Sequence, residues 1–236
     1  LHPDLVRADG AFLGNSRRLM DAHFALGCEA TWTCAPYQTG HRPGFGAQIA
    51  WAESNAIVFA NSVLGARTER YGDFLDISAA LVGRVPFAGL HTDQGRKASL
   101  VIDFSAISRE LLDQESAWPA MGALLGDIAG SRVVAMTGLH GDLADGGLTE
   151  DRLKSLGATA ASSGGVGLFH IISVTPEAPN LEAVVQANCE TIKVTTEQLR
   201  ASRDRLTTAV GDELDAVSLG TPHFSLPEFE ALAKEL

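Results

Sequence analysis

The chain has 236 residues, of which 45% are hydrophobic and 20% charged, and its formal net charge is −11. That length allows one substantial core. The acidic balance, with no basic patch, argues against nucleic acid as a partner. Three cysteines are too few for a disulfide framework, and no apolar run approaches the roughly 18 residues of a membrane span. The N-terminal LHPDLVRADG stretch does not resemble a signal peptide. We therefore expect a cytoplasmic globular protein with neither a nucleic-acid nor a membrane partner.

The first third of the chain alternates amphipathic stretches with turn-forming residues. Helical spacing predicts a helix over residues 11–27, with Gly27 as its C-cap. Residues 35–48 are rich in glycine and proline and predict a loop. Further helices are expected over residues 50–66 and 71–81.

The rest of the chain alternates short apolar runs, rich in β-branched residues, with longer helical stretches. Buried strands are expected over residues 99–104, 132–138, 166–174 and 215–220. Helices are expected over residues 118–129, 149–156, 180–188, 195–209 and 226–236. This order predicts an α/β fold with a layered, largely parallel sheet flanked by helices.

Two of the predicted strands lead into polar side chains. Ligands of parallel sheets bind beyond the carboxyl ends of the strands, so Thr175 and Ser225 are candidate substrate-binding residues. His223 follows the last predicted strand and could transfer a proton near neutral pH, although a histidine there is more often a structural hydrogen-bonding group. His170 lies inside a predicted strand, where a core role is the stronger interpretation.

The segment from residue 31 to residue 68 is unusually polar for a helical core segment. Ser54 and Asn61 are seven residues apart, as are Asn55 and Ser62, so each pair would share one face of a helix. Such a polar ladder suits a hydroxy-acid substrate, because Asn and Ser both donate and accept hydrogen bonds. Spacing alone leaves open the alternative of a buried polar helix packed against loop carbonyls.

Two further side chains of this segment could contact a small anion. Arg67 follows Gly65, and a guanidinium can form two parallel bonds with a carboxylate or phosphate. The alternative for Arg67 is a structural ion pair. Tyr37 adds a hydroxyl within a tight loop and is a third kind of candidate substrate contact.

Several common catalytic motifs are absent from the sequence. There is no P-loop, no GxGxxG after a strand, no GxSxG and no HExxH. Nucleotide-binding, esterase and zinc-protease functions are therefore poorly supported.

Six segments in a fixed order resemble one known family. They are TCAPY (residues 33–37), AWAESNA (50–56), ANSVLGART (60–68), GLH (89–91), LFHIISVTPEAP (168–179) and LGTPHFSLPE (219–228). Together they resemble aconitase X, the divergent branch of the aconitase superfamily. The resemblance implies that residues 1–236 are part of the aconitase X catalytic domain, its C-terminal part, with an N-terminal portion and a swivelling domain or subunit outside this chain.

The resemblance implies an iron–sulfur cluster and names candidate ligands. Cys34 is the main candidate, although an isolated cysteine is more often a small buried hydrophobe. Cys28 and Cys189 are weaker candidates. Thr221 stands where many members of the family carry a cysteine, and a hydroxyl is a poor replacement for a thiolate.

The resemblance also implies a hydro-lyase that dehydrates a small hydroxy acid. His223 and Glu53 are the candidate catalytic residues, and Glu53 could equally orient the cluster or pair with a neighbouring cation. The expected reaction converts cis-3-hydroxy-L-proline to 1-pyrroline-2-carboxylate, with the general base on the swivelling part. The alternatives are a mevalonate 5-phosphate dehydratase and a non-catalytic binding module that has lost its cluster, the latter suggested by Thr221.

Overall fold

A computed structural model describes residues 7–139 and 147–236. The chain divides into two compact units, residues 1–33 and 34–236, which we describe separately. The described part of the first unit is helix α1 (Gly10–Ala25) and the loop that follows it. The Asp9 side chain accepts hydrogen bonds from two backbone N–H groups and caps the helix. This confirms the helix predicted over residues 11–27.

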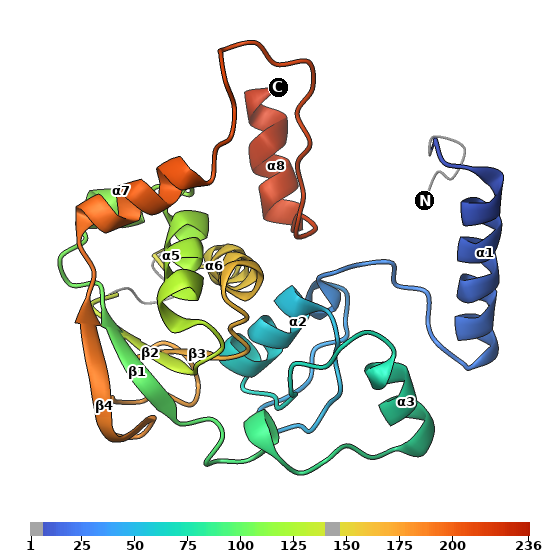
Figure 1. Cartoon of the computed structure of the whole chain (residues 1–236), viewed down its shortest axis with the longest axis horizontal. Helices are drawn as coiled ribbons and strands as arrows, with labels where there is room; N and C mark the ends of the chain where they lie inside the picture. Colours follow the sequence, from blue (N-terminus) through green and yellow to red (C-terminus); the bar gives the residue numbers. More distant parts are fainter. Residues whose placement is uncertain (1–6, 140–146) are drawn as a thin grey trace. The chain divides into compact units, whose positions relative to one another are not determined.

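The second unit is built on one parallel sheet. Its strands are β1 (Ala98–Asp103), β2 (Val134–Thr137), β3 (Phe169–Ile171) and β4 (Val185–Lys193), in the order β3-β2-β1-β4 (Figure 1). Every neighbouring pair is parallel. The predicted α/β class and parallel sheet are confirmed.

Helices connect the strands of the sheet, and further short helices and turns make up much of the segment that precedes β1. Helix α5 (Ala117–Ala129) joins β1 to β2, and α6 (Glu150–Ser163) joins β2 to β3. The others in the described residues of this unit are α2 (Ser54–Phe59), the π turn η3 (Ala60–Leu64), α3 (Leu75–Val82), α4 (Arg109–Leu112), α7 (Thr196–Arg205), α8 (Leu226–Glu235), and the 3₁₀ turns η2 (Pro36–Gln38) and η4 (Gly89–His91). The helix predicted over residues 50–66 thus begins later and ends as a π turn.

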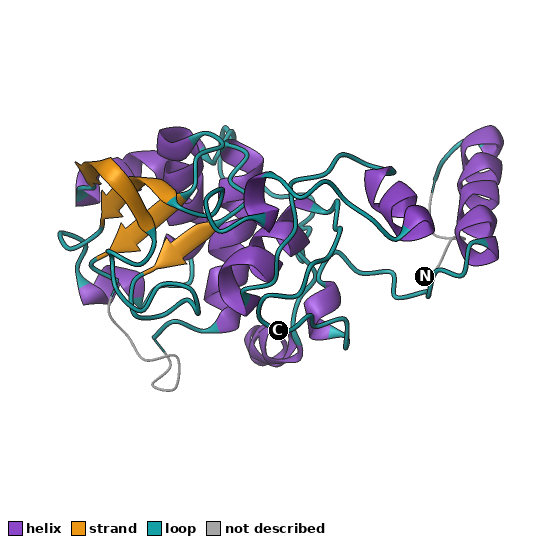
Figure 2. Cartoon of the chain, turned by 90° about the horizontal axis from the view of Figure 1, so that it is seen from below, coloured by secondary structure: helices purple, strands orange, loops and turns teal. Residues whose placement is uncertain are grey.

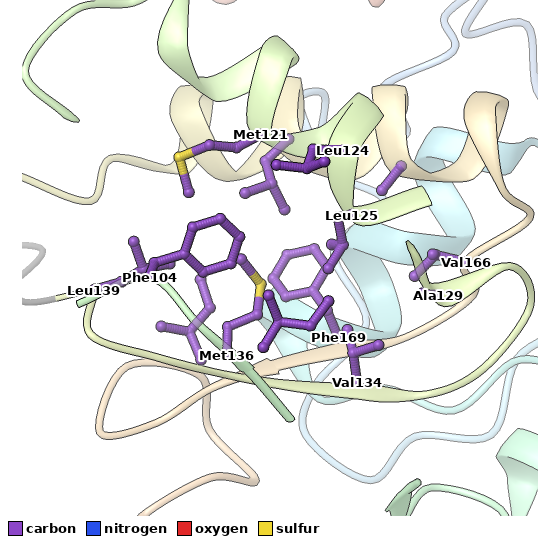
Figure 3. Packing of buried hydrophobic residues seen from close by; sticks show 14 of the residues in the cluster. Phe104, Met121, Leu124, Leu125, Ala129, Val134, Met136, Leu139, Val166 and Phe169 are labelled. Carbon is purple, nitrogen blue, oxygen red and sulfur yellow. The ribbon is translucent and has the colours of Figure 1, made fainter. Parts of the chain in front are cut away.

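One face of the sheet carries the main core. Phe104, Met136 and Phe169 point from the strands and their ends toward Met121 and Leu125 of α5 (Figure 3). All five side chains are fully buried. The opposite face has a smaller apolar cluster, made largely with the loop before β4 rather than with a helix. Figure 2 shows the four strands side by side, with helices packed beside them.

Glycines bring α5 and α6 into close contact. A Cβ added at Gly122 would lie 2.3 Å from the carbonyl oxygen of Leu156, and one at Gly164 would lie 2.0 Å from that of Gly126. Since no larger residue fits without a shift of the backbone, this contact fixes α6 against α5. A neighbouring face of α6, which includes Ser155 and Ser162, lines the functional site described below.

Two predicted elements are wrong. The helix expected over residues 180–188 is a loop followed by strand β4, which runs to Lys193. This stretch includes polar and helix-favouring residues such as Glu182 and Gln186, because β4 is an edge strand with a mostly exposed surface and does not need a continuous apolar run. The strand expected over residues 215–220 is an irregular, largely exposed segment that pairs with none of the four strands of the sheet.

Among the described residues, no helix is both long and apolar enough to cross a membrane.

Candidate functional site

A cleft of about 300 Å³ lies where several segments of the second unit meet. The loop at Cys34, the start of α2 and one face of α6 line it together with the turn at Thr221. The α6 residues Ser155, Ala158, Thr159 and Ser162 follow helical spacing of three and four, so they share one face. The sequence analysis missed this hydroxyl-rich face, although its spacing was a readable signal.

Cys34 and His223 meet beside this cleft although they are 189 positions apart in the sequence. The thiol sulfur Sγ lies 3.0 Å from the ring nitrogen Nδ1 of His223. The backbone N–H of Cys34 donates to the same nitrogen at 3.1 Å, and the backbone N–H of His223 donates to Sγ at 3.2 Å. Because Nδ1 accepts the amide hydrogen bond, the neutral ring carries its proton on Nε2. The tautomer and orientation of His223 are thereby set by Cys34.

Asn55 and Tyr37 form hydrogen bonds that support the backbone at Cys34. Asn55 Nδ2 donates to the Cys34 carbonyl oxygen at 3.2 Å, and the Tyr37 hydroxyl lies 2.9 Å from Nδ2 and 3.2 Å from Oδ1 of Asn55. The Tyr37 ring stacks on Phe59 with centroids 3.7 Å apart. Burial raises the pKa of Tyr37, so the phenol stays protonated and serves as a fixed hydrogen-bonding group. Both Tyr37 and Asn55 therefore position Cys34.

Glu53 and Ser54 lie at the start of α2. Glu53 is the N-cap, and its carboxylate accepts the backbone N–H of Ala56 at 2.6 Å. The Glu53 side chain is exposed, and both residues line the cleft. Glu53 therefore both caps α2 and presents a carboxylate to the cleft.

Asn61 and Ser62 are not at the cleft but in the core behind β3. Asn61 Nδ2 donates to the carbonyl oxygens of Thr68 and Gly167, each at 2.9 Å, and its Oδ1 accepts from the Thr68 N–H at 3.0 Å. Ser62 Oγ accepts the backbone N–H of Phe169 at 2.9 Å. Both side chains are almost fully buried and bond mainly to backbone groups, and Asn61 Oδ1 also accepts from Nη1 of Arg96 at 3.0 Å. The geometry favours the packing alternative for these two residues.

Arg67 belongs to a second cleft, of about 470 Å³, which also includes Arg96 and Glu177. Arg67 donates to Asp93 at 2.6 Å and to the His91 carbonyl oxygen at 3.3 Å, while its buried Nε has no hydrogen-bond partner. Arg96 forms two hydrogen bonds from its Nε to the Glu177 carboxylate, at 2.8 and 2.9 Å. Sequence reasoning missed Arg96, which stands in a polar stretch that resembles an ordinary loop.

Thr175, His170 and Ser225 have structural partners. Thr175 Oγ1 is buried and accepts the Ile171 N–H at 3.0 Å. His170 is buried in β3, with Nε2 2.8 Å from the Arg96 carbonyl oxygen, and burial lowers its pKa. Ser225 caps α8 in a capping box with Glu228 and donates to Asp151 at 2.7 Å. None of the three is among the residues that line the Cys34 cleft.

The cysteines are spread over different parts of the fold. Cys28 lies in the first unit, and Cys189 lies on edge strand β4, where its sulfur faces the Ala98 carbonyl oxygen at 3.6 Å. Within residues 7–139 and 147–236, no three His, Cys, Asp or Glu side chains are grouped to hold a metal ion. Cys34 is suited to be one thiolate ligand, because its sulfur already accepts an N–H bond of the kind that stabilises cluster thiolates. Thr221 lines the same cleft, where a cysteine would supply a second thiolate.

Family comparisons cover most of the chain. The family model described as aconitase X first domain matches residues 2–94, and the one described as aconitase X second domain matches residues 98–204. The chain belongs to the aconitase X family. The boundary between the two matched family domains falls immediately before β1, where the helical and loop region of the second unit gives way to the sheet.

Relatives within aconitase X carry two names. The chain is 41% identical to a cis-3-hydroxy-L-proline dehydratase of Pseudomonas aeruginosa over 91% of this chain and 36% of the relative. It is 35% identical to a phosphomevalonate dehydratase large subunit of Methanocaldococcus jannaschii over 97% of this chain and 55% of the relative. A crystal structure of Thermococcus kodakaraensis aconitase X in the holo-form superposes with a TM-score of 0.83 at 33% identity, covering 97% of this chain and 55% of that one. The chain thus spans between about a third and a little over half the length of these relatives.

Proposed function

We propose that this chain is part of a hydro-lyase that dehydrates a small hydroxy acid, with cis-3-hydroxy-L-proline as substrate and the Cys34 cleft as its site. The observation that carries the proposal is the Cys34–His223 pair, with Sγ and Nδ1 3.0 Å apart beside a cleft of about 300 Å³. Two side chains brought together from opposite ends of the unit, with reciprocal backbone hydrogen bonds, form a built constellation rather than an incidental contact.

The residues of the chain have distinct roles in this proposal. His223 presents its Nε2–H as a hydrogen-bond donor to the departing hydroxyl, since Nδ1 accepts the backbone N–H of Cys34. Ser54, Thr159 and Ser162 offer hydroxyls along the cleft that can orient the substrate. Tyr37 and Asn55 keep the Cys34 loop in place. The base that removes the α-proton is proposed to lie on a swivelling domain or subunit.

Cys34 is proposed as a ligand of an iron–sulfur cluster, with further ligands beyond the described residues. When bound, the iron centre would supply a Lewis acid that assists loss of the hydroxyl. We assign no ligand role to Thr221, because a neutral hydroxyl does not replace a thiolate. Cys28 and Cys189 remain secondary candidates, and a reducing, cytoplasmic setting is proposed for such a cluster.

A phosphorylated substrate is the alternative, by analogy with the relatives named phosphomevalonate dehydratase large subunit. No lysine or arginine is among the residues that line the Cys34 cleft. The amino-acid substrate is a zwitterion with no net charge, whereas a phosphate monoester carries close to two negative charges at neutral pH. The basic side chains Arg67 and Arg96 line the second cleft instead. A phosphorylated substrate would therefore need contacts in that second cleft. The lining of the first cleft favours the proline derivative.

The test uses the intact protein, purified anaerobically and reconstituted with iron and sulfide. Incubation with cis-3-hydroxy-L-proline and, separately, with mevalonate 5-phosphate is followed by mass spectrometry for loss of water. We expect water loss from the proline derivative, and we expect Cys34→Ala to remove both iron and activity. Dehydration of the phosphate ester alone would overturn the substrate. Absence of both cluster and activity would instead support a binding module that has lost its cluster.

A further inference from the structure

A lysine outside the cleft is buried beside the turn that carries His223. Lys154 lies on α6, and only 2% of its side chain is exposed. Its Nζ donates to Asp151 Oδ1 at 3.0 Å, to the His223 carbonyl oxygen at 3.3 Å, and to Glu228 Oε2. An ammonium group has three protons to donate, and here each of them has an acceptor. A buried charge is tolerated when it is paired and hydrogen-bonded in this way.

The acceptors of Lys154 are themselves linked to one another. Ser225 donates from its hydroxyl to Asp151 Oδ2 at 2.7 Å and from its backbone N–H to Glu228 Oε2 at 2.7 Å. Asp151 and Glu228 therefore each contact both Lys154 and Ser225. The result is a closed set of contacts that joins α6 to the start of α8, with the His223 carbonyl oxygen as one of its members.

Few other described contacts hold the turn at residues 221–225 in place. The segment that leads to it exposes its apolar side chains, with Val210, Leu214, Val217 and Leu219 all more than half exposed. The Phe224 ring packs on Phe229 of the same C-terminal segment. The approach to the turn thus has no core packing of its own, and the polar contacts at Lys154 and at Cys34 determine its position.

We propose that Lys154 is a positioning residue, which fixes the turn at residues 221–225 against α6 and thereby sets His223 beside Cys34. This inference rests on the proposed function for the importance of the pair, but the positioning itself can be measured without the reaction.

The experiment compares thiol reactivity in the intact, metal-free, reduced protein. The alkylation rate of Cys34 with iodoacetamide is followed by peptide mass spectrometry over a range of pH values, and Cys189 serves as an internal standard. The variants are Lys154→Met, His223→Ala and the double substitution. Lys193→Met, which removes an exposed lysine on β4, is the matched control.

If Lys154 acts through His223, Lys154→Met changes the pH profile of Cys34 alkylation in the same way as His223→Ala. The double variant then resembles either single variant within about twofold, Cys189 keeps its rate, and Lys193→Met keeps the wild-type profile. A wild-type profile for Cys34 in Lys154→Met would overturn the proposal. The proposal would also be overturned if the changes in the Cys34 alkylation rate caused by the two single substitutions were multiplied together in the double variant.

A general loss of structure would show itself in Cys189. If Lys154→Met raises the alkylation rate of Cys189 together with that of Cys34, the variant has lost structure more widely. Glu228→Gln is then used as the test variant in place of Lys154→Met. Glu228→Gln keeps the buried ammonium and the capping geometry while it weakens one link, so we expect a partial shift of the Cys34 profile toward that of His223→Ala. An unchanged profile in this milder variant would count against the proposal.

The outcome is separable from the proposed function. A protein that shows the shared Cys34 profile and no dehydratase activity would retain the positioning role and lose the proposed reaction. If the reaction is present, Lys154→Met should lower kcat to a similar extent as His223→Ala, while a residue that only supported stability would leave kcat of the folded fraction unchanged.

Discussion

The two ends of the α2–η3 helix carry the same kinds of side chain and use them differently. At the start, Ser54 lines the cleft and Glu53 is exposed, so their polar groups can reach a ligand. At the far end, Asn61 and Ser62 are buried and bonded to backbone groups of neighbouring loops and of β3. Burial, rather than residue type, separates side chains that can bind a ligand from those that hold the fold together.

The π turn explains why the sequence spacing did not reveal this division. Seven residues correspond to two turns of an α-helix, but residues 60–64 form a π turn with a wider repeat. A spacing of seven that crosses this turn therefore does not keep Asn61 and Ser62 in line with Ser54 and Asn55. A π turn directed by tertiary packing is invisible to periodicity.

The largest effect is expected in the buried ion pair near the far end of the helix. Arg96 is 3% exposed and Glu177 13% exposed, and Arg96 also donates to both oxygens of Asn61. Arg96→Met removes both hydrogen bonds to the Glu177 carboxylate and leaves only Arg67, 3.9 Å away, as a cationic neighbour, and we expect the free energy of unfolding to fall by about 3–5 kcal/mol. Urea denaturation of the intact protein measures this. Since Arg42 and Glu150 are both nearly half exposed, Arg42→Met is the matched control and should change stability by less than about 1 kcal/mol.

A pair of serine substitutions tests the comparison itself. Ser62→Ala removes the acceptor of the Phe169 N–H in the core, so we expect a loss of about 1–3 kcal/mol of stability. Ser54→Ala removes only a hydroxyl at the cleft, and we expect a stability change within about 0.5 kcal/mol, with a raised KM in the proposed reaction. Equal losses of stability in the two variants would contradict the division between the two ends.

The free energy of unfolding should depend on pH through His170, which is buried in β3 behind Asn61 and Ser62. Burial lowers the pKa of His170 below that of an unfolded histidine, which is about 6.5. As the pH falls below about 6.5, the unfolded chain therefore binds a proton that the folded chain does not, and stability decreases until the folded-state pKa is passed. Urea midpoints between pH 7.5 and 5 should show this loss, and His170→Gln should flatten it.

A smaller loss of stability than in Ser62→Ala is expected for Ser225, whose side chain caps α8. Ser225→Ala removes the cap and the hydrogen bond to Asp151, and a capping serine contributes about 1 kcal/mol. Thermal unfolding should register this loss. A larger change in KM than in stability would restore Ser225 as a substrate contact.

Local patterns predicted much of this protein. Apolar runs of β-branched residues identified β1, β2 and β3, whose side chains are buried on both faces and so differ in composition from helices. The same logic failed at β4, because an edge strand needs no apolar surface, and at residues 215–220, because an apolar run forms a strand only where another strand can pair with it.

Residue chemistry in the sequence singled out Cys34, Glu53, Ser54 and His223 individually, and the family resemblance gave them roles. Only the tertiary structure brought Cys34 and His223 to 3.0 Å, placed the hydroxyl face of α6 beside them and connected Lys154 to the His223 turn. Sequence determines which elements form, because helix and strand periodicity depends on near neighbours. Whether a polar side chain faces a cleft or the core is decided by residues more than a hundred positions away, which no local pattern contains.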